Sequence, residues 1–196
     1  MVGLAGEIKL HNFFINKGKA EQHTQDVNRA LFQLFPFLSE ITQCEDIDLD
    51  KRGVDKILKL LFFDSGKMIT INVIIDEKIR FEDYGDILLE EWSNKEKRIA
   101  GWACRKKITD FILFYWPPTG RLIILPFLLL QAIYVKNYKK WRKLYGTKEA
   151  ENKNYVTTNI PVPTEIIMSE MINIMQGYHR IFNQNYGGNY AYQKPF

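Results

Sequence analysis

Residues 54–79 read VDKILKLLFFDSGKMITINVIIDEKI, and this stretch decides the fold. Two runs rich in β-branched and aliphatic residues, 54–63 and 68–79, flank the sequence Asp-Ser-Gly-Lys, which is typical of a tight turn. We therefore expect a β-hairpin whose strands are joined at residues 64–67.

The register of this hairpin brings charged side chains together at one end. A two-residue turn at Ser65-Gly66 sets Asp55 directly opposite Asp76. Directly opposed residues share a face, with side chains about 5 Å apart. Lys78 lies two positions beyond Asp76 and points the same way. A turn one residue longer would set Asp55 against a neighbour of Asp76, so the site depends on this turn.

This grouping has the chemistry of a metal site. Two aspartates that close repel each other strongly unless a cation lies between them. Mg²⁺ favours oxygen ligands and keeps several waters. One such water can attack a phosphodiester, and an adjacent lysine such as Lys78 can orient it or neutralise developing charge. The plainer interpretation is that Asp-x-Lys arises by chance and that strand ends commonly carry charges.

The reverse face of the hairpin is almost wholly apolar, and we expect it to be buried. It carries Val54, Leu58, Leu60 and Phe62, opposed by Ile69, Ile71, Val73 and Ile75.

The rest of the chain mixes helix and strand signals. We expect helices at 20–34, 126–145 and 165–176, strands at 41–47 and 87–92, a second hairpin from 109–116 and 121–125, a solvated acidic loop at 46–50, and polar, proline-marked chain at 147–163. The tail, 183–196, is expected to be mobile or ordered by a partner. The pattern predicts an α/β fold with a central mixed β-sheet flanked by helices.

Composition limits the class of protein. The 196 residues suffice for one compact domain with short appendages. Cys44 and Cys104 lie far apart, which indicates neither a disulfide framework nor a zinc site and favours a reduced, cytosolic setting. The longest apolar run, 122–135, is interrupted by Pro126 and Gln131 and is too short to span a membrane.

Two motifs around the hairpin point to a known family. Gly53-Val54-Asp55, followed by Ile75-Asp76-Glu77-Lys78, resembles the Asp…(Asp/Glu)-x-Lys signature of the PD-(D/E)XK nuclease superfamily. The stretches 84–91, Gly101-Trp102 and 109–113 resemble phage and bacterial endonuclease-like members. The resemblance covers roughly residues 20 to 145. It implies a restriction-endonuclease-like core of helix, three strands, helix and strand, although the segment after Lys78 has the pattern of a strand.

The resemblance also implies roles for individual residues. Asp55 and Asp76 would bind Mg²⁺, with Mn²⁺ as a substitute, and Lys78 would assist the water. Glu21 lies in the first helix, where many members place an additional acidic ligand, and it fits a solvated helix residue equally well. Glu90 or Glu91 would supply another carboxylate. Alternation puts these two on opposite faces, and we favour Glu90.

Basic residues cluster in two segments that suit a phosphate backbone. One surrounds Trp102 and includes Lys106 and Lys107; the other comprises Lys136, Lys139, Lys140, Arg142 and Lys143. The second cluster is interleaved with aromatic residues and contains no acidic residue. A solvated helix face with aromatic core contacts explains it equally well.

Together these features predict a Mg²⁺-dependent endonuclease that hydrolyses DNA in the cytoplasm of a bacterial or phage-infected cell. The nuclease core would span residues 1–146, and a C-terminal extension 147–196. The alternative is a catalytically inactive nucleic-acid-binding protein, or a phage structural protein, with the same fold. Many superfamily members act as homodimers in which each subunit cuts one strand, and the sequence leaves the oligomeric state open.

Overall fold

The structure is a computed structural model that describes residues 23–152 and 155–186. A helix over residues 23–34 comes first. The elements that follow are β1 (Leu38–Gln43), α2 (Ile47–Lys51), β2 (Lys56–Asp64), β3 (Lys67–Ile79), β4 (Asp86–Asn94), β5 (Ile99–Ala100), β6 (Phe111–Trp116), β7 (Arg121–Pro126), α3 (Phe127–Tyr145), β8 (Lys148–Glu151), β9 (Val156–Pro163) and α4 (Thr164–Tyr186).

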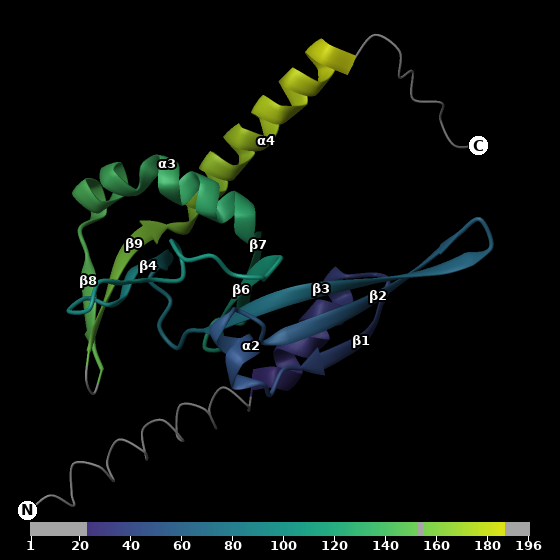
Figure 1. Ribbon diagram of the computed structural model, residues 1–196, viewed down its shortest axis with the longest axis horizontal. Coiled ribbons are helices and arrows are strands. Elements are labelled where there is room, and N and C mark those ends of the chain that lie inside the picture. The colour runs from purple at the N-terminus through teal and green to yellow at the C-terminus, as the bar shows by residue number, and fades with distance from the viewer. Residues whose placement is uncertain (1–22, 153–154, 187–196) are drawn as a thin grey trace, which may run out of the picture.

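The strands form two sheets, which Figure 1 shows beside each other. The first has the order β1-β2-β3-β6-β7 and is mixed, because β3 and β6 run parallel while its other neighbours are antiparallel. The second, β5-β4-β9-β8, is antiparallel. The predicted α/β class and mixed sheet are confirmed. The prediction of one central sheet is wrong, because β4 and β5 leave the first sheet and pair elsewhere.

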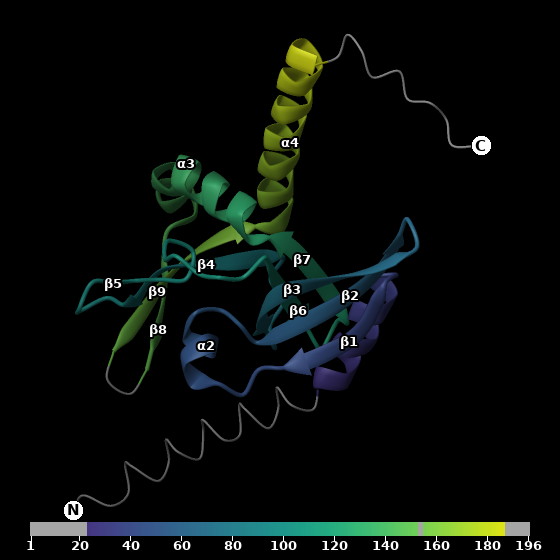
Figure 2. The ribbon, with the colours of Figure 1, turned by 45° about the vertical axis from the view of Figure 1, so that its right-hand side comes forward.

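Strand β6 is the centre of the molecule, since both of its faces are buried. Leu113 and Tyr115 pack against Val27 and Leu31 of the first helix. Residues on the other face pack against the second sheet and against α3 and α4: Ile112, Phe114 and Trp116. The first sheet is thus covered on one side by the 23–34 helix and on the other by a layer of strands and helices (Figure 2).

The β2–β3 hairpin has the predicted register. Asp64 pairs with Lys67, and the ladder continues in register to the pair of Lys56 and Ile75. Ser65 and Gly66 have φ angles of 50° and 77°. A two-residue turn with both φ angles positive matches the right-handed twist of the strands, and glycine adopts this conformation readily.

The apolar reverse face of the hairpin is buried only at the end near the core. Leu58 and Ile75 are fully buried, whereas Ile69 and Ile71 are 43% and 47% exposed. The prediction of a buried face is wrong for the outer half, because the hairpin extends beyond the body of the molecule (Figures 1 and 2).

Two further segments differ from the prediction. The expected acidic loop at 46–50 contains the helix α2, which Asp46 caps by accepting hydrogen bonds from the amides of Asp48 and Leu49. The polar segment 147–163 forms the hairpin β8–β9. Since β9 pairs with β4, the predicted boundary at residue 146 passes through the second sheet.

The connection from β3 to β6 also departs from the core that the family resemblance implies. Strands β4 and β5 stand where that core has a helix, as the strand-like pattern after Lys78 indicates. The last part of this connection, residues 101–110, returns to β3, and the side chains of Thr109 and Asp110 form hydrogen bonds to it. Asp110 accepts a hydrogen bond from the amide of Ile74, and the Thr109 hydroxyl donates to the Ile74 carbonyl.

Candidate active site

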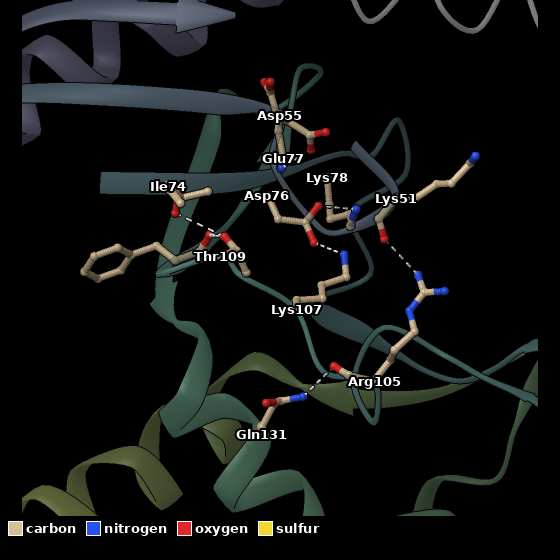
Figure 3. Close-up of polar contacts among 11 residues, drawn as sticks. Lys51, Asp55, Ile74, Asp76, Glu77, Lys78, Arg105, Lys107, Thr109 and Gln131 are labelled. Carbon is tan, nitrogen blue, oxygen red and sulfur yellow. Dashed lines mark hydrogen bonds and ion pairs between the residues drawn. The ribbon is translucent and has the colours of Figure 1, made fainter. Parts of the chain in front are cut away.

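Asp76 lies near the end of β3, on the face of the first sheet that looks toward the second. It is 1% exposed, and both carboxylate oxygens are engaged: Lys78 Nζ lies 2.5 Å from Oδ1, and Lys107 Nζ contacts Oδ2. Figure 3 shows the carboxylate between the two ammonium groups. Burial alone would raise the pKa of Asp76, but the two lysines outweigh it and hold that pKa below its ordinary value. Asp76 is therefore ionised at neutral pH.

Asp55, the residue directly before β2, approaches the same point. Its amide donates to the Ile75 carbonyl over 2.9 Å, and its Oδ2 accepts a 2.5 Å hydrogen bond from the Glu77 amide. Burial raises the pKa of Asp55 to about 7; Lys78 opposes this rise and the negative charge of Asp76 adds to it. The two carboxylates are thus close enough to influence each other's charge, as the hairpin register predicts.

Lys78 is the amine between these two carboxylates. Burial would lower its pKa, but Asp76 and Asp55 raise the pKa above its ordinary value, so the side chain stays charged. Its side chain is 31% exposed, whereas that of Lys107 is 4% exposed. Asp55, Asp76 and Lys78 are therefore brought together as the sequence predicts.

Lys107, predicted from the sequence as a nucleic-acid-binding residue, is a member of this cluster in the structure. Its side chain is only 4% exposed and ends on Asp76. Burial, and then the charge of Lys78, lower the pKa of Lys107. No local sequence pattern marks this contact, because 31 positions separate the two residues.

Gly53 makes room for Lys107. A Cβ at this position would lie 2.8 Å from Lys107 Cδ and 3.4 Å from Asp76 Oδ2. The φ angle of Gly53 is +86°, a conformation that side chains also disfavour. In the sequence, the glycine directly before Val54-Asp55 is the one feature that indicates close packing of another side chain at this position.

Glu90 reaches the cluster from β4 of the second sheet. Burial raises its pKa, and the charges of Lys78, Arg105 and Lys107 oppose that rise. Gly101 packs directly against the backbone of β4, where no larger residue fits, because a Cβ at position 101 would lie 2.1 Å from the Glu90 carbonyl oxygen. Glu91 is buried and pairs with Arg142 at 3.3 Å. Glu90 is thus the carboxylate of this pair whose charge interacts with Lys78 and Lys107, and its role at the site stays a prediction.

A second ion pair lies on the opposite face of the same hairpin. Lys56 is fully buried, lies 2.9 Å from Glu77 Oε2 and donates to Gln43 Oε1 at 2.8 Å. Lys56 and Glu77 belong to the face opposite that of Asp55 and Asp76. Removing one partner of such a buried pair strongly destabilises the protein, because the other charge is left buried and uncompensated. No motif in the sequence marks this pair.

Asp55 and Asp76 can bind a hard cation such as Mg²⁺ only if water molecules complete its coordination shell. The described residues contain no group of three or more His, Cys, Asp or Glu side chains placed to hold a metal ion. Asp55 and Asp76 supply two carboxylates, and the buried Asp55 carries a raised pKa that a nearby cation would lower. Mg²⁺ commonly binds through one or two carboxylates and several waters, so the pair fits that ion.

The remaining predicted residues lie elsewhere. Five of the predicted basic residues lie on α3 with exposed side chains: Lys136, Lys139, Lys140, Arg142 and Lys143. Lys139, Arg142 and Lys143 line an open hollow of about 540 Å³ together with Tyr138. Lys106 is exposed on the loop before β6. Glu21 and the tail beyond residue 186 lie outside the described residues.

Comparisons with known proteins add little. Neither the protein-family models nor the curated proteins give a match to this chain. Among solved structures, a nuclease from a fusselovirus matches with 15% sequence identity and a TM-score of 0.29, covering 91% of this chain and 96% of that one. This TM-score is too low to support a conclusion about fold or function. No helix over the described residues is long and apolar enough to cross a membrane.

Proposed function

We propose that this protein is a metal-dependent endonuclease of the PD-(D/E)XK type that hydrolyses phosphodiester bonds in DNA. The observation that carries the proposal is the meeting of Asp55, Asp76 and Lys78 at one end of a rigid hairpin. A bound Mg²⁺ would supply a water of lowered pKa and stabilise negative charge on the phosphate. Mn²⁺ is the expected substitute. The cytoplasm of a bacterial or phage-infected cell is the setting that this proposal implies.

The chain's own residues divide the work. Asp55 and Asp76 would hold the metal ion, and Glu90 would add a carboxylate close by. Lys78 is charged and lies against Asp76, so it would orient the attacking water or hold negative charge on the phosphate. Burial of the two carboxylates strengthens each of these charge interactions relative to water.

The basic face of α3 supports the choice of DNA as substrate. Lys139, Lys140 and Lys143 are exposed, and no ion pair is found for them among the described residues. Lysines in this state are available to phosphate groups. A contact joins α3 to the site loop, since Gln131 Nε2 donates to the Arg105 carbonyl at 2.9 Å.

A second candidate function is nucleic-acid binding without cleavage. One specific observation favours it: both oxygens of Asp76 are engaged by lysines, so the charge of this carboxylate is already balanced. In a protein that only binds nucleic acid, both lysines would stay on Asp76, and no metal ion would replace them.

Cleavage assays separate the two functions. The purified protein is incubated with Mg²⁺ and with supercoiled, linear and single-stranded DNA. We expect cleavage, and we expect Asp76→Asn and Lys78→Met each to reduce its rate about a hundredfold or more. The matched controls are Asp64→Asn and Lys67→Met, which make the same changes at the exposed tip of the same hairpin. DNA binding without cleavage by any variant would support the second candidate.

A further inference from the structure

Lys107 holds a position that no established role explains. Its ammonium group contacts Asp76 Oδ2 while Lys78 holds Oδ1, so cations already surround the carboxylate that is proposed to bind metal. We infer that Lys107 occupies the place of a metal ion on Asp76 and must leave before a metal ion binds there. This inference rests on the proposed function.

Charge is the first argument. A divalent ion on Asp76 would stand a few ångströms from the ammonium groups of both lysines. Like charges at that separation repel strongly in a site shielded from water, and the Lys107 side chain is 4% exposed. Asp55 acts on both ammonium groups, but water can screen Lys78, which is 31% exposed, from a bound ion better than it can screen the enclosed Lys107. Lys107 makes its direct contact with Asp76, so it is the cation whose place the metal ion would take.

The space around Lys107 is the second argument. Gly53 leaves the gap in which the Lys107 side chain lies, since a Cβ there would come within 2.8 Å of Cδ. A side chain at position 53 would fill the space that Lys107 now occupies. Without Lys107, Asp76 and Asp55 would be buried with one lysine between them, which costs stability. Lys107 thus stabilises the metal-free protein.

Only the side chain has freedom to move. The backbone on both sides of Lys107 is anchored: the Ile108 amide donates to the Arg52 carbonyl at 3.1 Å, and the Arg105 carbonyl accepts from Gln131. Rotation of the side chain would release the ammonium group while the loop stays in place. Glu90 carries a charge within reach, and a substrate phosphate would offer another partner. Metal binding would thereby free the Lys107 ammonium group to contact a substrate phosphate.

Calorimetry with Mn²⁺ alone tests the inference on the full chain. We expect Lys107→Met to bind Mn²⁺ about tenfold or more tightly than the wild type, because competing ligands weaken each other reciprocally. Lys67→Met is the control and should leave the affinity unchanged. Mn²⁺ should also raise the midpoint of thermal unfolding more in Lys107→Met than in the wild type, because the variant lacks its own cation.

A labelling experiment on the wild type needs no variant. An amine-reactive reagent should modify Lys107 slowly without metal and faster with saturating Mn²⁺, as read by mass spectrometry of peptides. Equal or weaker Mn²⁺ binding by folded Lys107→Met, or unchanged labelling while Mn²⁺ is bound, overturns this inference alone. Absence of Mn²⁺ binding by both the wild type and Lys107→Met overturns the inference together with the proposed function.

Discussion

At the scale of single residues, Asp55 is the group whose charge depends most on a cation. Its carboxyl accepts the Glu77 amide and lies beside Asp76, and burial raises its pKa to about 7. A carboxyl with a pKa raised in the folded state stabilises the fold at low pH, where it is protonated. That contribution is lost as pH rises from the unfolded value near 3.8 through about 7.

Asp55→Asn should therefore stabilise the metal-free protein increasingly as pH rises. Asparagine keeps an oxygen for the Glu77 amide and carries no charge. We expect the difference in unfolding free energy between variant and wild type to grow from about pH 4 to about pH 7 and then to level off. Urea titrations at several pH values measure it. A difference that is the same at pH 5 and pH 8 would contradict the account of Asp55.

Gly53 offers a second test at this scale. Gly53→Ala should lower the free energy of unfolding by about 1–2 kcal/mol through the unfavourable φ angle alone. It should also displace Lys107 and so tighten Mn²⁺ binding. Gly85→Ala is the matched control, because Gly85 has a φ angle of +74° and no atom lies within 4 Å of the position that its Cβ would take. It should lose similar stability and leave Mn²⁺ affinity unchanged; equal Mn²⁺ affinity in both variants contradicts the prediction.

At the scale of elements, the site depends on two strands that meet from different sheets. Strand β3 presents Asp76 and Lys78, and β4 presents Glu90, while the loop before β6 brings Lys107 between them. Helix α3 anchors this loop through Gln131 and carries exposed lysines toward its C-terminal end. Binding and chemistry are thus assigned to different elements.

The lysines of α3 can be tested as an element. Lys139→Ala combined with Lys143→Ala should weaken DNA binding and reduce the slope of log K against log salt by about 0.9 for each phosphate that the variant no longer neutralises. Lys59→Ala combined with Lys67→Ala removes the same charge from the β2–β3 hairpin and should leave the slope unchanged. Binding isotherms at several salt concentrations measure this. Equal slopes for the two double variants would exclude α3 as the DNA-binding element.

Local sequence signals account for the elements that were predicted. Gly66 and the flanking aliphatic runs determine the hairpin, and its two-residue turn determines the register that joins Asp55 to Asp76. Gly146 ends α3 where expected. Strand β8 was missed because all four of its residues are exposed, and β9 because it contains Pro161 and Pro163. Edge positions and prolines weaken the strand pattern.

Long-range packing between distant segments accounts for what was not predicted. Lys107 reaches Asp76 only because β6 runs parallel to β3, which brings the preceding loop back to the site. The outer half of the hairpin is exposed because the 23–34 helix covers only its base, where Val27 and Leu31 meet Leu58. Neither arrangement has a periodic signal in the sequence.

At the scale of the whole molecule, the acidic cluster lies where the first sheet faces the second. The shared core of β6, β4, β9, α3 and α4 fixes the two sheets against each other. A cation between Asp55 and Asp76 would therefore be held by a rigid scaffold, and Lys107 is the side chain expected to move. Pre-organised carboxylates of this kind stabilise charge without rearrangement of the backbone.

The central claim is that Asp55 and Asp76 hold a divalent cation, and an anomalous difference map from crystals soaked in Mn²⁺ tests it most directly. We predict a peak bridging the two carboxylates, about 2.1 Å from an oxygen of each, with the Lys107 ammonium moved off Asp76. A map with no peak between these carboxylates, in crystals of protein that cleaves DNA with Mn²⁺, would contradict the claim.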